Sequence, residues 1–238
     1  MNPNEIELVQ EYKQRKKSLD AEWQSKKRVR SQDEAFVVFV KCILSSRTNW
    51  NKVVSVVDGL AKNRILFTGN AGQLLDEVRG IGGMVDHEAR ANWIVEDRQM
   101  FPLVFWLTDS IRKGSISLGP YGLSEKEILA QGNVQAWSAL IQNRGLTREA
   151  LRAVVKVLKG AGDKQASHFL FSLGFEGYAV IDTYILDKLV EFHLISSKPK
   201  NLASPRYLSL EQMMQQWSTS IGIPLHIVDM LWWRNRHS

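Results

Sequence analysis

The sequence predicts an all-α protein, and three observations lead to this prediction. Apolar residues recur at i, i+3, i+4 and i+7, the spacing of one helix face, most regularly over 147–158. Two segments, 31–34 and 124–127, have the Ser-x-x-Glu pattern of a capping box at a helix start. Short loops containing Gly, Asn or Pro separate the apolar segments, and none of them has the pattern of a β-hairpin turn.

The expected helices follow one another along the whole chain. The runs VVFV and VVSVV are β-branched and could form strands, but their length and flanks favour helices. The segments 113–124 and 196–209 are predicted to be loops. In chain order the helices are expected over a basic segment at 13–30, then 35–44, 49–61, 71–80, 87–101, 125–130 and 148–159, after the turn at 160–162, after Asp182, and over 225–233 behind Pro224.

Composition limits the classes of function. The 238 residues suit one globular domain or two packed subdomains. The single cysteine, Cys42, allows neither an internal disulfide nor a four-cysteine site, and the five histidines lack metal-binding spacing. No apolar run reaches the roughly 18 residues of a membrane span, and the charged N-terminus is unlike a secretory signal. We therefore expect no metal, no cofactor and no membrane association, and residence in the cytoplasm near the nucleoid.

Positive charge is concentrated near the N-terminus. The net charge is +6, and residues 13–30 contain eight Lys or Arg against two acids, Asp20 and Glu22. Such a cluster favours polyanions through release of counterions from a phosphate backbone. A solvated helix face explains the same pattern equally well, so charge alone leaves both interpretations open.

A turn of two glycines joins two of the expected helices. In LKGAGDKQASHFLFSLGF (158–175), Gly160 and Gly162 flank Ala161, and Lys164 follows at the start of the next helix. Without Cβ atoms the backbone can approach a ligand closely, and amides beside a helix N-terminus bind phosphate. Many helical hairpins use such turns for packing alone, and that alternative stays open at this point.

A carboxylate eighteen residues after Lys164 adds a possible reaction. Asp182, in AVIDTYILDKL, is placed to cap the helix that begins there. Desolvation and a positive local field favour a neutral, nucleophilic lysine. An aspartate facing it could orient the amine and stabilise the positive charge that develops on a sugar when an N-glycosidic bond breaks.

These segments resemble the HhH-GPD superfamily of DNA glycosylases. LKGAGDKQASHFLFSLG followed by YAVIDTYIL is most similar to the archaeal-type, second class of 8-oxoguanine DNA glycosylases, and the resemblance over 35–101 and 150–190 covers about half of the chain. It implies a bifunctional DNA glycosylase/AP lyase that repairs DNA by base excision. Lys164 then matches the nucleophile that attacks C1′ and allows β-elimination, and Asp182 matches the catalytic aspartate. Gly160 and Gly162 match the hairpin glycines that hold the DNA backbone.

Further candidate site residues follow from the same resemblance and, for His168, from helical spacing. Arg47, in LSSRTN, stands where relatives often have a glutamine and is a candidate to fill the space left by the flipped base. His168 lies one helical turn after Lys164 and is a candidate DNA contact, with packing as the alternative. Trp232, or Trp233 beside it, matches the aromatic residue that contacts the oxidised guanine. A core role for either tryptophan is the alternative.

The resemblance also implies an architecture and a partner. We expect a single unit of two helical subdomains, 33–168 and 1–32 plus 175–238, with the helix–hairpin–helix motif beside a cleft. The partner is double-stranded DNA with a damaged base, bound by a monomer without an iron–sulfur cluster. Three other functions stay open: the same chemistry on another base, a non-catalytic helix–hairpin–helix module that binds DNA, and a helical protein–protein adaptor.

Overall fold

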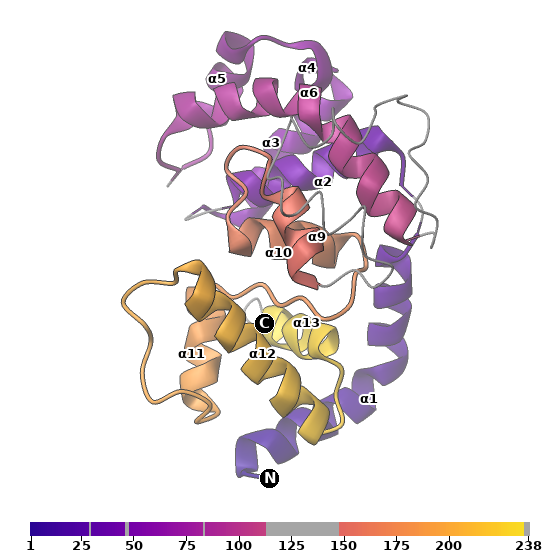
Figure 1. Ribbon diagram of the computed structural model, residues 1–238, viewed down its shortest axis with the longest axis vertical. Helices are drawn as coiled ribbons and strands as arrows, with labels where there is room; N and C mark the ends of the chain where they lie inside the picture. Colours follow the sequence, from indigo (N-terminus) through magenta and orange to yellow (C-terminus); the bar gives the residue numbers. More distant parts are fainter. Residues whose placement is uncertain (29, 46–47, 83, 113–147, 236–238) are drawn as a thin grey trace. The chain divides into compact units, whose positions relative to one another are not determined.

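The computed structural model describes residues 1–28, 30–45, 48–82, 84–112 and 148–235. Every regular element among these residues is a helix, which confirms the all-α prediction (Figure 1). The chain divides into two compact units, Val29–Phe169 and Met1–Arg28 with Leu170–Ser238. Among the described helices, none combines the length and apolar character that crossing a membrane requires.

The Val29–Phe169 unit is all-helical in its described residues. Its helices are α2 (Gln32–Leu44), α3 (Trp50–Lys62), α4 (Ile65–Thr68), α5 (Ala71–Arg79), α6 (His87–Arg112), α9 (Arg148–Val155) and the greater part of α10 (Asp163–Ser172). α2 packs against α3 and α6, and α5 also packs along α6. Phe36 and Phe39 of α2 meet Phe101 of α6, with ring centroids 4.9 and 5.7 Å apart, and Phe39 also meets Phe169 of α10 at 5.6 Å.

The second unit places one helix at its centre. α13 (Leu225–Asn235) contacts α1 (Pro3–Lys26), α11 (Thr183–Glu191) and α12 (Ser204–Ser220). Every residue of α13 from Leu225 to Trp232 is buried. A helix buried on all its faces cannot be amphipathic, which explains why the apolar letters of this segment give no clear periodicity.

Local sequence rules account for most helix starts. The predicted capping box at Ser31 is present, since the Ser31 hydroxyl accepts from the Glu34 amide at 3.1 Å and Glu34 accepts from the Ser31 amide at 2.9 Å. Asn2 and Asn70 cap α1 and α5 in the same reciprocal way. VVFV and VVSVV lie in α2 and α3, so the helical interpretation of these runs is confirmed.

Several predicted boundaries were wrong. α1 begins at Pro3, ten residues before the basic segment, because Asn2 caps it, and α6 continues past Pro102 to Arg112. α12 begins at Ser204, inside the predicted loop 196–209, with Pro205 in its first turn, where proline is favoured. The second capping box and the predicted loop at 113–124 lie outside the described residues.

Candidate functional site

The turn between α9 and α10 requires glycine at one of its two glycine positions. Gly160 has φ +71°, and a Cβ built there would lie 2.7 Å from Cε3 of Trp93 on α6. Both the conformation and the close approach therefore demand glycine. Gly162 is exposed and has no positive φ; a Cβ there would meet only the flexible Gln165 side chain, at 3.2 Å. The second glycine thus leaves the backbone accessible without being needed for the turn.

Contacts on both sides hold this hairpin (residues 156–163) in shape. The amides of Ala161 and Gly162 donate to Leu158 O and Gly160 O at 3.3 and 3.2 Å. Lys156 Nζ and Asp163 Oδ1 form an ion pair at 2.7 Å across the turn. On the side facing α6, the Lys159 amide donates to Asp97 Oδ1 at 2.7 Å. The turn is therefore fixed both to itself and to α6.

Lys164 is the second residue of α10, directly after the hairpin. The residue is half-buried. The first-turn amides of a helix have no partners within the helix, and the helix dipole makes this end electropositive. Lys164 thus lies at the helix start where the sequence placed it, while its role as a nucleophile and phosphate binding at this end of the helix stay predictions.

His168 packs within its own unit. Its imidazole lies 5.2 Å from the ring of Trp50, the first residue of α3, with the rings tilted by 42°. The neighbouring Ser167 is buried and accepts from Arg152 Nε at 3.0 Å. The packing alternative therefore has a contact in the structure, while contact between His168 and DNA stays a prediction. Arg47 lies outside the described residues.

Asp182 caps α11, as expected from the sequence. Its Oδ1 accepts from the Ile185 amide at 2.9 Å, and its own backbone is extended. Tyr207 fixes the segment that leads to it: the hydroxyl donates to Ala179 O at 2.6 Å and accepts from the Ile181 amide at 3.2 Å. The carboxylate of Glu211 accepts from the Ala179 amide at 3.1 Å. Buried hydrogen bonds from α12 thus hold the half-buried Asp182 in place.

A buried acid on α13 lies close to this segment. Asp229 is fully buried, and neither of its oxygens has a hydrogen-bond partner among the described residues. Burial, and to a lesser degree the carboxylate of Asp182, raise its pKa to about 8. The Val180 amide and Lys26 act in the opposite direction, although the amide does not reach hydrogen-bond geometry. Asp229 is therefore protonated at neutral pH.

The two candidate base-binding tryptophans differ in burial. Trp232 is 1% exposed, and its ring stacks on Trp217 at 5.6 Å and contacts Phe192 at 5.3 Å. Its carbonyl accepts from the Tyr184 hydroxyl at 2.8 Å. Trp233 is only half-buried. Base contact by either residue stays a prediction, and burial favours Trp233.

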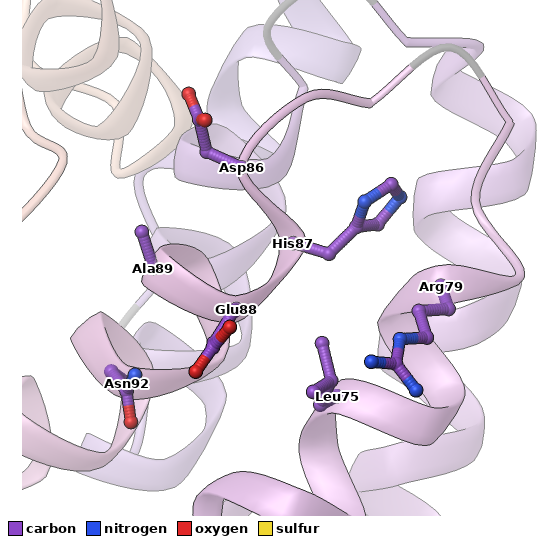
Figure 2. Close-up of a pocket in the computed structure, with 7 residues that line it drawn as sticks. All are labelled: Leu75, Arg79, Asp86, His87, Glu88, Ala89 and Asn92. Carbon is purple, nitrogen blue, oxygen red and sulfur yellow. The ribbon is translucent and has the colours of Figure 1, made fainter.

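One pocket in the Val29–Phe169 unit lies apart from the predicted site residues. It has a volume of about 590 Å³ and lies where α5 ends and α6 begins. Figure 2 shows Arg79 and His87 beside the same space, and the pocket is lined by Leu75, Arg79, Asp86, His87, Glu88, Ala89 and Asn92. Among the described residues there is no cluster of three His, Cys, Asp or Glu that could hold a metal.

Comparison with known proteins identifies the family. A family model described as 8-oxoguanine DNA glycosylase, with a helix–hairpin–helix motif, matches residues 16–223. The chain belongs to this family. The match extends well beyond the two segments in which the resemblance was first seen, and it confirms that resemblance.

Relatives of this glycosylase family support the assignment. The 8-oxoguanine DNA glycosylase/AP lyase of Korarchaeum cryptofilum is 29% identical over 206 residues, which cover 87% of this chain and 81% of the relative. That of Methanocaldococcus jannaschii is 35% identical, but only over 92 residues, 39% of this chain and 43% of the relative. The longer alignment includes most of both chains.

Two solved glycosylase structures have the same fold. The crystal structure of the M. jannaschii 8-oxoguanine DNA glycosylase superposes with a TM-score of 0.70 at 22% identity and covers 98% of this chain and 95% of that one. The same enzyme in complex with a 15mer DNA containing 8-oxoguanine gives 0.72 at 20% identity, with 97% of each chain covered. The predicted helix–hairpin–helix glycosylase fold is therefore confirmed.

Sequence reasoning missed the buried carboxyls behind the two candidate elements. Asp229 interrupts the apolar run LHIVDMLWW, and a lone acid in such a run was a usable signal. Asp97 lies in the mixed segment VEDRQ, where nothing distinguishes it from a surface residue. Its partner, Lys159, is 62 residues away.

Proposed function

We propose that this protein is a DNA glycosylase/AP lyase that removes 8-oxoguanine from double-stranded DNA. The observation that carries the proposal is the family match over 16–223, within which Lys164 directly follows the hairpin and Asp182 caps α11. The hairpin amides and the start of α10 would bind the DNA backbone.

The chemistry follows from a partly desolvated amine and a carboxylate. Lys164 Nζ attacks C1′ of the deoxyribose, and the bond from C1′ to the base nitrogen breaks. The base leaves with the electron pair and takes up a proton. Asp182 stabilises the positive charge that develops on the sugar, because a carboxylate held at a fixed position needs no reorganisation during the reaction.

The strand is then cut through the covalent intermediate. Opening of the sugar ring gives a Schiff base between C1′ and Nζ of Lys164. Loss of a proton from C2′ expels the 3′ phosphate by β-elimination, and water releases the enzyme from the remaining sugar. This route needs only groups of the protein, the DNA and water.

Borohydride trapping tests the proposal directly. The protein is incubated with a duplex that carries 8-oxoguanine opposite cytosine, and a covalent adduct is expected after reduction. Lys164→Gln should abolish the adduct and keep affinity for the duplex, whereas Lys62→Gln, at an exposed lysine that ends α3, should form it like wild type.

A panel of other lesions defines the substrate. An adduct that depends on Lys164 but forms only with another damaged base would keep the reaction and reject 8-oxoguanine. Binding without an adduct on any lesion would leave a DNA-binding module without this activity. Absence of both would contradict the whole proposal.

A further inference from the structure

Two residues of α6, Trp93 and Asp97, lie one helical turn apart and contact the hairpin. The Trp93 ring lies against Gly160, so closely that any side chain there would collide with it. Asp97 lies four residues further along the same helix face and accepts from the amide of Lys159, the residue before Gly160, at 2.7 Å. The two contacts fix consecutive residues of the turn, one by shape and one by a hydrogen bond.

Burying a carboxyl group at position 97 costs desolvation free energy. Asp97 is 2% exposed, and its Oδ2 has no hydrogen-bond partner among the described residues. Burial raises its pKa to about 7, and the Lys159 amide opposes that shift only in part. Of the nearby charges, the Glu96 carboxylate raises the pKa and the Lys159 ammonium lowers it. An apolar side chain would avoid this cost but would leave the Lys159 amide without an acceptor.

Ionisation of Asp97 changes the strength of this contact. A carboxylate accepts from an amide more strongly than a neutral acid does, because the bond is charge-assisted. Ionised Asp97 thus pulls the Lys159 amide toward α6, and the protonated form holds it less firmly. The first-turn amides of α10, which follow the hairpin, can bind one phosphate only while they keep a common direction, so loosening Lys159 disturbs the turn that sets their direction.

We propose that Asp97 is a positioning residue: through the Lys159 amide, its carboxylate holds the hairpin in the conformation that binds the DNA backbone. This inference rests on the proposed function, because it assigns the hairpin to DNA. It predicts that affinity contains a component that rises with pH as Asp97 ionises. The net positive charge of the protein also falls as pH rises, and this weakens DNA binding. The contribution of Asp97 therefore has to be measured as the difference between wild type and a variant without the Asp97 carboxyl.

Three variants separate the contact from its charge. Asp97→Asn keeps an acceptor oxygen without the charge. It also removes the free-energy cost of burying an ionisable group, so the variant is expected to fold. Asp97→Ala removes the acceptor. Glu88→Gln removes an exposed carboxylate at the start of α6, which is not among the charges that shift the pKa of Asp97, and is the control for a general change in charge.

The first measurement is hydrogen exchange of the Lys159 amide at about pH 6 and pH 8, corrected for intrinsic exchange. Wild type should gain protection from the lower to the higher pH, by about fivefold relative to Asp97→Asn. In Asp97→Ala the Lys159 amide should be unprotected at both values, and Glu88→Gln should follow wild type. Equal protection in wild type and Asp97→Asn at both pH values would overturn the proposal, and this readout needs no DNA.

The second measurement is affinity for an undamaged duplex over the same pH range. Asp97→Asn should bind with a flatter pH profile and about fivefold more weakly at the higher pH, while borohydride trapping at saturating 8-oxoguanine duplex stays unchanged. An unchanged pH profile of binding in Asp97→Asn would contradict the role in DNA binding. If wild type fails to bind any duplex, the proposed function fails, and the exchange measurement still decides whether Asp97 positions the hairpin.

Discussion

The two units of the protein each place a buried carboxyl behind a proposed functional element, but they treat it differently. Asp97 lies behind the hairpin and has an amide donor at 2.7 Å. Asp229 lies behind the Asp182 segment, and its oxygens have no hydrogen-bond partner among the described residues. Burial raises the pKa of Asp97 to about 7 and that of Asp229 to about 8. Burial thus raises both pKa values, and the difference between the two sites is the amide donor, which only Asp97 has among the described residues.

The surroundings explain this difference. The Lys159 amide donates to Asp97 and favours its ionised form, whereas the carboxylates of Asp182 and Glu211 both oppose ionisation of Asp229.

The largest expected effect is on stability through Asp229. The unfolded chain releases this proton near pH 4 and the folded chain near pH 8, so between these values the folded state binds the additional proton. The free energy of unfolding should therefore fall as pH rises over this range, by on the order of 5 kcal/mol for Asp229 alone. Urea unfolding of wild type and Asp229→Asn across this range measures the difference. The same slope in both proteins would show that Asp229 ionises freely in the folded state.

Substitution of the two tryptophans of α13 distinguishes a role in core packing from a role in binding the damaged base. Trp232→Ala should lower the free energy of unfolding by about 4 kcal/mol, because it empties a buried aromatic cluster. Trp233→Ala should cost less than about 1 kcal/mol and weaken binding of the 8-oxoguanine duplex more than that of an undamaged duplex. Both are measured by urea unfolding and fluorescence anisotropy. Equal loss of affinity for the two duplexes would remove Trp233 as a base contact.

Asp182→Asn tests the carboxylate that Asp229 lies behind. Asparagine is as good a helix cap as aspartate, so the unfolding free energy should change by less than about 0.5 kcal/mol. Base release in a single turnover should slow by about 100-fold, because the charge that stabilises the sugar is lost. Asp187→Asn, at an exposed acid of the same helix that pairs with Lys198, is the control and should react like wild type. Equal rates in both variants would place the catalytic carboxylate elsewhere.

The smallest effect is expected at the hairpin glycines. Gly160→Ala should cost about 2 kcal/mol of stability, because it combines a left-handed φ with a collision at Trp93. Gly162→Ala should cost less than about 0.5 kcal/mol, since only the Gln165 side chain must move. Thermal unfolding compares the two, and duplex affinity should fall in both. Undiminished affinity in Gly162→Ala would mean that the backbone there does not approach DNA.

Local interactions were predictable from the sequence. The capping box at Ser31, the cap at Asp182 and the buried face of α9 all depend on residues within about one or two turns, and the structure confirms each. The position of Lys164 at a helix start, directly after the glycine turn, also follows from local spacing. The sequence by itself therefore determined most of the described helices, though not α4 and α12, together with the hairpin and the order of the candidate catalytic residues.

Only the tertiary structure decided which side chains are buried. Trp232 and Trp233 are adjacent in one helix, yet Trp232 is buried in a cluster with Phe192 and Trp217 and Trp233 is half-buried. From its local sequence Asp97 is expected to be a surface acid, but the structure places the backbone amide of Lys159, 62 residues further along the chain, against it. Burial and pKa depend on contacts between segments distant in the chain, and neither propensity nor periodicity within one helix encodes those contacts.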